Sequence, residues 1–395
     1  MRIFVLGAGA TGSLLAQLLA RQGHNVSCGD KDPERARRFL GKKSPLPVVQ
    51  VNARNLWGIV RAARGCHLIV NAAPAVFNEV VLRAALRLRA HYLDLAAHLT
   101  RNPFKAEQLY FHERFEQKNR TAVITAGVAP GLTNLLAMRA AHMLDAVPGG
   151  RGTVEAVYIR LYESTESEDP ISTWSADVSF DAAVSRPRVI RDGRFRFVKR
   201  FSEPERFRFP PPIGETTVVL AAQDEVATLP YSLRLREMDV KIGGNEIARL
   251  RRWYRQGKLT RSRGLVAKRF PKTPTPRMVA KLIRRGVLQN ARFAAAVLVR
   301  GTRNEQPMLI RWDATFPTLY QIRQRGLLTT PIAYATAHLA ALFIKHFPRD
   351  LAGVYPPAAL SAEIRQAILA DVRTRGFRIT MKITRLKRSE DESEF

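Results

Sequence analysis

The sequence predicts an α/β protein, with a Rossmann-type, doubly wound parallel sheet followed by a second, α+β domain. Three observations lead to this prediction. First, a glycine-rich turn joins the first apolar run to a helical pattern. Second, short apolar strands and helices alternate over about the first third of the chain. Third, longer strand-like runs with proline-rich turns follow. Strand–helix units joined by short loops form parallel sheets, and a change of pattern indicates a second layer.

The first element is a strand that ends in a glycine turn. Residues 3–6 are apolar, residues 7–12 read GAGATG, and leucines then recur at helical spacing until Gly23. A second strand at residues 26–29 ends at Asp30. An export signal needs an unbroken apolar run of about 7–15 residues, which these glycines interrupt. We therefore interpret the stretch as strand, turn, helix and strand, with an ordinary tight turn that binds nothing as the alternative.

In this context a G-x-G-x-x-G sequence is typical of a dinucleotide site. Gly7 permits the tight turn, Gly9 lets the backbone approach a pyrophosphate, and Gly12 lets the helix pack closely on the strand. The N–H groups at the helix start bind phosphate, and Asp30, 18 residues after Gly12, lies where a carboxylate binds the adenosine ribose. The predicted cofactor-binding residues of this stretch are Gly7, Ala8, Gly9, Ala10, Thr11, Gly12, Asp30 and Lys31.

NAD is the expected cofactor, with NADP as the alternative. The Asp30 carboxylate would repel the additional phosphate of NADP by about 1–4 kcal/mol at a separation of a few ångströms. Four cations that follow it could neutralise that phosphate: Lys31, Arg35, Arg37 and Arg38. However, Asp32 and Pro33 are a cap and a first-turn proline, so the arginines are predicted to lie on a helix, facing solvent or the sheet at different angles, whereas Asp30 lies at the strand tip.

Four further strands are predicted at residues 47–53, 67–73, 91–96 and 121–127, with helical patterns between them. In an open parallel sheet, ligands bind beyond the carboxyl ends of the strands. Small residues at these ends would leave room for a flat nicotinamide. The residues predicted to line the cofactor there are Asn71, Ala72, Ala73, Pro74 and Pro130.

Two polar residues follow the strand at residues 91–96 and are the predicted catalytic groups. Asp94 lies near the expected hydride-transfer region, and His98 is the side chain that titrates near neutral pH as a general acid or base. The alternatives are that Asp94 caps a turn and that His98 is a loop histidine bonded to the backbone. No metal site is predicted.

Composition limits the remaining possibilities. The formal net charge is +30, and residues 247–304 contain 17 Lys and Arg and no Asp or Glu. Without a nucleic-acid-binding motif, this stretch is interpreted as a solvated basic face, and nucleic-acid binding is not expected.

The two cysteines, Cys28 and Cys66, are expected to be core residues of a protein in a reducing compartment. The longest uncharged apolar segment, residues 327–344, contains Pro331 and predicts a buried or interface helix in place of a membrane span. We expect a cytoplasmic protein.

The predicted organisation has four parts. Residues 1–130 form the dinucleotide-binding domain and residues 131–325 the α+β domain. Residues 326–383 form a helical segment that packs back on the first domain, and residues 384–395 are a charged tail.

Seven blocks of the sequence, in order, resemble the saccharopine dehydrogenase family: GAGATG, VNAAPAVFNEVV, YLDLAAHLT, VITAGVAPGLTNLLA, FPPPIG, DEVATLP and GVYPPAAL. The resemblance implies a Rossmann domain split in sequence and a central domain for substrate binding and dimerisation. It also implies NAD(P)-dependent hydride transfer at a C–N bond of an amino acid or amine through an imine, in a homodimer or larger homo-oligomer.

The resemblance further implies site residues. It matches Gly7, Gly9, Gly12 and Asp30 to the cofactor positions, and it lines the cleft with Asn71, Pro74, Asp94, His98, Pro130 and Gly131. Trp174 and Glu225 lie in segments that resemble the substrate-domain blocks, and they are the predicted substrate-binding residues.

Two stretches depart from the family pattern and leave the substrate open. LYESTES, residues 161–167, replaces the usual Gly-Gly-x-Pro stretch, and Thr125-Ala126 stands where an Asn or Asp often precedes the turn. The alternatives are a cofactor-binding sensor that has lost catalysis, a polyamine-pathway reductase and an enoyl reductase-like protein.

Overall fold

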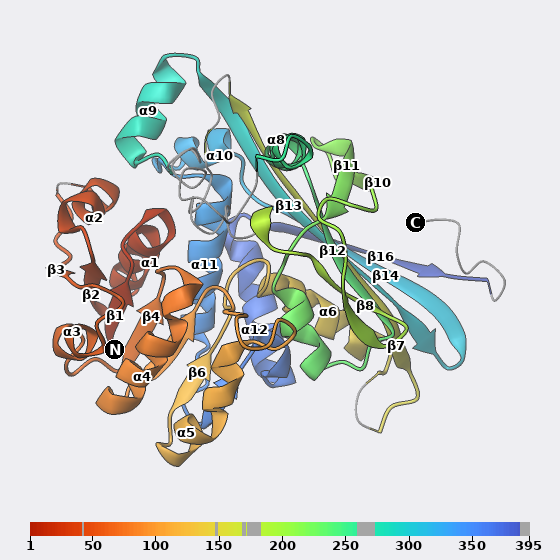
Figure 1. Ribbon diagram of the computed structural model, residues 1–395, viewed down its shortest axis with the longest axis horizontal. Helices are drawn as coiled ribbons and strands as arrows, with labels where there is room; N and C mark the ends of the chain where they lie inside the picture. The colour runs from red at the N-terminus through yellow and green to blue at the C-terminus, as the bar shows by residue number, and fades with distance from the viewer. Residues whose placement is uncertain (42, 147–148, 168–170, 172–182, 259–272, 388–395) are drawn as a thin grey trace.

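The computed structural model describes residues 1–41, 43–146, 149–167, 171, 183–258 and 273–387. It contains two sheets, one with helices on both faces and one long and mixed, which lie side by side in Figure 1. The predicted fold class, a doubly wound parallel sheet with a second domain, is confirmed.

The first sheet has seven parallel strands in the order β15-β6-β5-β4-β1-β2-β3. The strands are β1 (Arg2–Leu6), β2 (Asn25–Asp30), β3 (Val48–Gln50), β4 (Leu68–Asn71), β5 (His91–Asp94), β6 (Thr121–Val123) and β15 (Gly353–Tyr355). Because the chain order reverses between β1 and β4, the ligand crevice of this fold class lies at the carboxyl ends of these two strands.

The helices of this layer follow the strands in sequence. They are α1 (Ala10–Arg21), α2 (Pro33–Leu40), α3 (Leu56–Ala62), α4 (Asn78–Leu88), α5 (His112–Gln117), α6 (Leu132–Met143), α11 (Pro331–Lys345) and α12 (Ala362–Val372). The α2 helix begins as predicted, because the Asp32 carboxylate accepts a hydrogen bond of 2.9 Å from the Arg35 amide and Pro33 occupies the first turn.

The second sheet contains the path β10-β11-β12-β7-β13-β14-β16, and β8 and β9 extend it beside β12. Its strands are β7 (Thr153–Ser167), β8 (Arg188–Arg191), β9 (Arg194–Phe197), β10 (Glu205–Phe209), β11 (Gly214–Leu220), β12 (Glu237–Gly243), β13 (Leu288–Arg303), β14 (Gln306–Thr315) and β16 (Arg378–Arg385). Helices α8 (Asn245–Arg255), α9 (Pro276–Arg284) and α10 (Leu319–Gln324) accompany it.

Side chains on β7 alternate between two cores. Val157, Ile159 and Leu161 pack in the same core as the leucines of α6, whereas Tyr158 and Tyr162 face an aromatic cluster on the opposite side of the sheet. The α6 face of β7 therefore borders the first domain.

The C-terminal segment contains two strands in addition to the predicted helices. Helix α11 packs against α1, and β15 adds a strand to the first sheet next to β6. The alternating sequence of β16 instead pairs with β14 in the second sheet. The end of the chain thus contributes to both layers.

The apolar segment at residues 327–344 forms most of α11, and that helix is largely buried. Among the described residues, none of the helices has both the length and the apolar character that crossing a membrane requires. Cys28 is buried and Cys66 is half-buried, and both are free thiols.

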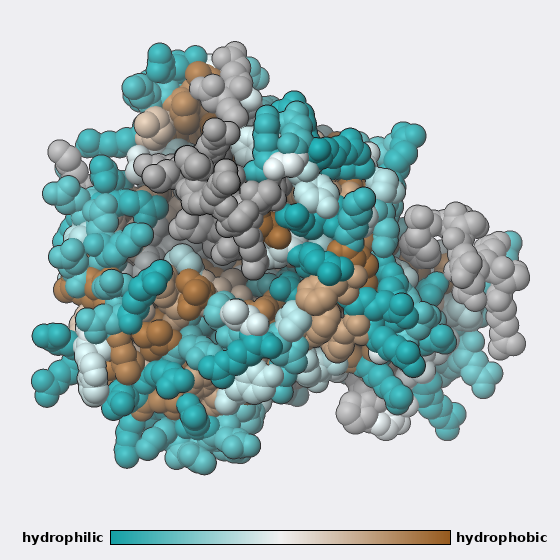
Figure 2. Space-filling model, in the orientation of Figure 1, coloured by the Kyte–Doolittle hydropathy of each residue, from teal (hydrophilic) through white to brown (hydrophobic). Residues whose placement is uncertain are grey.

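Exposed cations occupy α8 and α9. The exposed ones in these two helices include Arg252, Arg255, Arg277, Lys281 and Arg284. Figure 2 shows hydrophilic residues over α8 on the visible face. Residues 259–272, which contain further cations, lie outside the described part of the chain.

Candidate functional site

The glycine turn after β1 is shaped for close packing on one side and open space on the other. Gly7 has φ +94°, and a Cβ there would lie 2.6 Å from the Ala73 amide nitrogen. A Cβ on Gly12 would overlap the Gly7 carbonyl oxygen, whereas one on Gly9 would meet nothing within 4 Å. The turn therefore needs glycine at two positions for packing, and it leaves the backbone of Gly9 accessible to a pyrophosphate.

Asp30 lies at the end of β2 and joins that strand to the glycine turn. One carboxylate oxygen accepts a hydrogen bond of 2.9 Å from the Ala8 amide, and the other accepts one of 3.0 Å from the Asp32 amide. Each oxygen retains a second lone pair. The side chain is thus placed where it can also accept from ribose hydroxyls.

The arginines of α2 have partners within their own region. The Arg35 guanidinium lies 5.2 Å from the centre of the Phe39 ring, and Arg37 donates a hydrogen bond of 2.9 Å to the Leu46 carbonyl. Arg38 lies 3.9 Å from the Asp32 carboxylate. Each of the three guanidinium groups thus has a partner other than Asp30.

Asn71 organises the loop that follows β4. Its side-chain oxygen accepts from the Ala73 amide at 3.1 Å, and its amide group donates to the Asn78 side chain at 2.7 Å. Asn78 in turn donates to the Ala96 carbonyl at 2.8 Å, which ties the β4 loop to the loop after β5. Ala72, Ala73 and Pro74 remain partly exposed, so the predicted cofactor-lining loop keeps an accessible surface of small residues.

Asp94 is 1% exposed and is held by three donors. Its carboxylate accepts hydrogen bonds from the Thr125 amide at 2.7 Å, the Tyr92 hydroxyl at 2.9 Å and the Gln108 amide group at 3.0 Å. Burial raises the pKa of Asp94 to about 7, although these hydrogen bonds act to lower it. Thr125 has φ +55°, and its hydrogen bond to Asp94 helps to hold that conformation.

His98 forms a chain of polar contacts in the loop after β5. Its Nδ1 lies 2.8 Å from a carboxylate oxygen of Glu107, and its Nε2 lies 2.8 Å from the Thr100 hydroxyl. The contact at Nδ1 has the distance of an ion pair but not the geometry of a hydrogen bond, so Glu107 acts on the imidazole through its charge, and Nε2 lies within hydrogen-bond distance of the Thr100 hydroxyl. The structure thus gives His98 an orienting carboxylate and a polar neighbour that is exposed to solvent.

Glu107 was not among the residues predicted from the sequence. It is 2% exposed, and its other carboxylate oxygen accepts hydrogen bonds from the Thr100 amide at 2.5 Å and the Arg101 amide at 2.6 Å. Burial acts to raise the pKa of Glu107, but the hydrogen bonds from Arg101 and Thr100 and the charge of His98 outweigh it and lower that pKa. Glu107 is therefore an ionised residue that closes the loop around His98.

The second domain contacts this region through residues 224–231. Asp224 accepts a hydrogen bond of 3.0 Å from the Ala97 amide, next to His98. Glu225 is fully buried, and one of its carboxylate oxygens accepts from the Thr133 hydroxyl at 3.0 Å, in the first turn of α6. Burial raises the pKa of Glu225 to about 7. Glu225 therefore lies beside the Pro130-Gly131 turn, whereas Trp174 lies outside the described residues.

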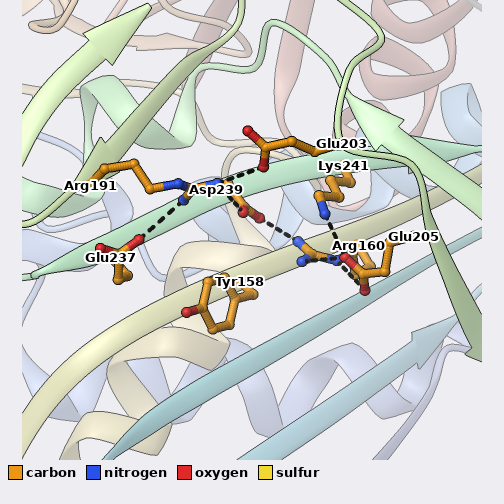
Figure 3. Close-up of a pocket in the computed structure, with 8 residues that line it drawn as sticks. All are labelled: Tyr158, Arg160, Arg191, Glu203, Glu205, Glu237, Asp239 and Lys241. Carbon is orange, nitrogen blue, oxygen red and sulfur yellow. Dashed lines mark hydrogen bonds and ion pairs between the residues drawn. The ribbon is translucent and has the colours of Figure 1, made fainter. Parts of the chain in front are cut away.

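The charged cavity in Figure 3 is a different feature. Tyr158 and Arg160 on β7 reach it from the sheet face opposite α6, because side chains alternate along a strand. Arg160 contacts Asp239 at 2.5 Å and Glu205 at 2.8 Å, and Arg191 contacts Asp239 at 2.9 Å. Such mutual pairing of buried charges is characteristic of a structural ionic network, and the network faces away from the glycine turn.

The first part of the chain matches a known family. Residues 3–123 match the family described as saccharopine dehydrogenase NADP binding domain. A carboxynorspermidine synthase from Vibrio cholerae serotype O1 is 24% identical over 166 residues, which cover 36% of this chain and 40% of that enzyme. The match thus spans less than half the length of that relative.

The whole fold is similar to a solved structure. Saccharopine dehydrogenase (L-Glu forming) from Saccharomyces cerevisiae superposes with a TM-score of 0.70 at 12% sequence identity, over 97% of this chain and 99% of that one. At this identity the similarity establishes the fold, including the second sheet, and leaves the reaction to be argued from the site.

Proposed function

We propose that this chain, whose residues 3–123 match the saccharopine dehydrogenase NADP-binding domain family, is an NAD(P)-dependent oxidoreductase that acts on a C–N bond of an amino acid or amine through an imine. One observation carries the proposal. The accessible Gly9 turn and the His98–Glu107 pair follow β1 and β5, two strands of one parallel sheet. This arrangement supports a cofactor site and a proton-transfer group on the same edge.

In the proposed reaction, the nicotinamide cofactor supplies the group that accepts or donates hydride. The Gly9 backbone and the first turn of α1 would hold its phosphates, and Asp30 its adenosine ribose. His98 would take the proton that the substrate nitrogen loses as the imine forms, directly or through the Thr100 hydroxyl. Glu107 would act as a positioning residue, because its carboxylate orients the imidazole and stabilises the positive charge that develops there.

We further propose a preference for NAD over NADP. The Asp30 carboxylate would face the additional phosphate of NADP, and the α2 arginines that could offset it each contact another group, namely Phe39, Leu46 or Asp32. Lys31 is exposed, and its positive charge would favour binding of the additional phosphate of NADP. The buried position of Asp30 makes its repulsion the larger effect.

The name of the Vibrio relative, carboxynorspermidine synthase, motivates a test with amines within the same reaction class. We would screen purified protein with NAD and NADP against lysine, saccharopine and diamines, and follow the absorbance of the reduced nicotinamide. Turnover with one of these compounds supports the proposal. Cofactor binding without turnover across the panel favours the alternative of a sensor, and absence of cofactor binding refutes both.

A further inference from the structure

Helices α9 and α10 form a corner of the second domain that has a small core of its own. Val279 of α9 and Leu319 of α10 are buried in this core, together with Leu288 and Ala291 of β13. Figure 1 shows both helices at the top of the view, near one end of the long strands. Because the core takes up one side of each helix, the other sides are left exposed.

The exposed surface of this corner, which we call the α9–α10 face, is basic. Its exposed cations are Arg277, Lys281, Arg284, Arg285 and Arg323. Arg277, Lys281 and Arg284 recur at helical spacing and therefore line one side of α9. Neither helix contains an Asp or a Glu, and within the part of the chain that the structure describes none of the five cations forms an ion pair. The positive charge of the face is thus uncompensated.

Two large side chains of apolar or aromatic character are exposed on the same face. Met278 is 46% exposed and Tyr320 is 58% exposed. Met278 lies three residues before Lys281 and Tyr320 three residues before Arg323, so each has a cation as its neighbour on the helix surface. Figure 2 shows hydrophobic residues next to hydrophilic ones at the position of α9.

This combination fits the surface of a membrane that contains anionic lipids. Each lysine or arginine near such a surface strengthens binding about fivefold. Apolar and tyrosine side chains beside the cations enter the boundary between head groups and acyl chains. A nucleic acid would attract the same cations, but its phosphate backbone offers the Met278 side chain no apolar environment.

We propose that the α9–α10 face docks the protein on the surface of anionic phospholipid membranes. Docking of this kind requires no membrane-spanning helix. The formal net charge of +30 acts in the same direction, because it attracts the whole protein to an anionic surface. The proposal goes beyond the proposed reaction and does not depend on it, since the face contains neither the glycine turn nor His98.

Sedimentation of the full chain with lipid vesicles tests the proposal. Vesicles of phosphatidylglycerol and phosphatidylcholine in equal parts are compared with vesicles of phosphatidylcholine alone. The protein should bind the anionic vesicles at least about tenfold more tightly, and this binding should weaken as the salt concentration rises. Equal binding to both kinds of vesicle, or binding to neither, refutes the proposal.

Variants are needed to locate the site, because a net charge of +30 attracts any anionic surface. The face variant combines three substitutions on α9: Arg277→Gln, Lys281→Gln and Arg284→Gln. At about fivefold for each cation, its binding to the anionic vesicles should be weakened about 100-fold. If this variant does not fold, Lys281→Glu alone changes two units of charge and should weaken binding about 25-fold.

The matched control removes three exposed cations on and after β9: Arg194→Gln, Arg196→Gln and Lys199→Gln. It has the same net charge as the face variant and should retain most of the binding to anionic vesicles. The affinity for NAD should be unchanged in both variants. If the control weakens vesicle binding as much as the face variant does, the attraction is diffuse and the proposed face is wrong.

A substitution without a change of charge separates lipid from nucleic acid. Met278→Gln should weaken binding to anionic vesicles about threefold or more, because glutamine gains less than methionine at the head-group boundary. A DNA duplex is titrated at the same salt concentration as the second polyanion. If the wild-type protein binds the duplex more tightly than the vesicles, and Met278→Gln alters neither affinity, the face is a nucleic-acid surface and the proposal is refuted.

Discussion

Replacing Glu107 with glutamine should disable His98 without disturbing the loop. In the protein, one carboxylate oxygen accepts from the Thr100 and Arg101 amides, and the other faces Nδ1 of His98. A glutamine keeps its carbonyl oxygen on the two backbone donors, so its NH₂ group must face Nδ1. That group is a donor, and it forces the imidazole proton onto Nε2.

With its proton on Nε2, His98 can no longer accept at the nitrogen that faces Thr100. Loss of general base catalysis typically costs about 10²–10⁴-fold, so kcat should fall by this factor while the affinity for NAD stays unchanged. The backbone hydrogen bonds survive, and thermal stability should therefore change little.

Two measurements check this prediction. Nitrogen chemical shifts of the His98 ring, recorded without substrate, should report the change of tautomer, and steady-state kinetics should report the loss of kcat. A double variant with His98→Ala should be no slower than His98→Ala alone, since both changes remove one function. A Glu107→Gln protein that is folded, shows the changed tautomer and retains full kcat would refute the role of His98 as the base.

Three further predictions concern the cofactor turn and the domain contact. Gly9→Val should abolish NAD binding in equilibrium titrations and leave the fold intact, because the valine side chain would fill the open space over the turn. An unchanged Kd for NAD would contradict the assignment of this turn as the pyrophosphate site. Asp30→Ser should narrow the ratio of NADP to NAD dissociation constants, and a wild-type protein that binds NADP more tightly would overturn the preference for NAD. The pKa of Glu225 is raised in the folded state to about 7 from 4.5, so between these pH values the folded protein binds more protons than the unfolded chain. The contribution of Glu225 to the free energy of unfolding therefore falls as pH rises through this range. Glu225→Gln should flatten this part of the unfolding free energy measured from pH 4.5 to 7, and an unaltered profile would show that Glu225 does not titrate there.

The sequence predicted those features whose signals are local. The glycine turn, the Asp32 cap and the strands of the first domain each depend on a few neighbouring residues, and the structure contains all of them. The strand β15 was not predicted because its three residues carry no periodic pattern, and only its position beside β6 makes it a strand.

Residues that act through distant partners were also missed. Glu107 gains its role from a loop that brings it to His98, and nothing in its neighbouring sequence indicates this contact. Asn245 and Thr165 are far apart in the chain, and the hydrogen bonds between them, which fix α8 on β7, have no signal in either stretch of sequence. Asp94 was predicted as a site residue from its place at the end of a strand. Its three hydrogen-bond donors were not predicted, because they lie in three separate segments.

In the proposed reaction, hydride moves between a nicotinamide cofactor and a carbon atom bonded to nitrogen. The reaction should be run in the reductive direction with NADH that carries deuterium at the transferred position, an amine and an oxo acid, and the product should be analysed by mass spectrometry. We expect one deuterium on the carbon atom of the new C–N bond, and none with the Gly9→Val protein. Deuterium on a carbon of a former C=C bond, or no deuterated amine with any amine and oxo acid tried, would contradict it.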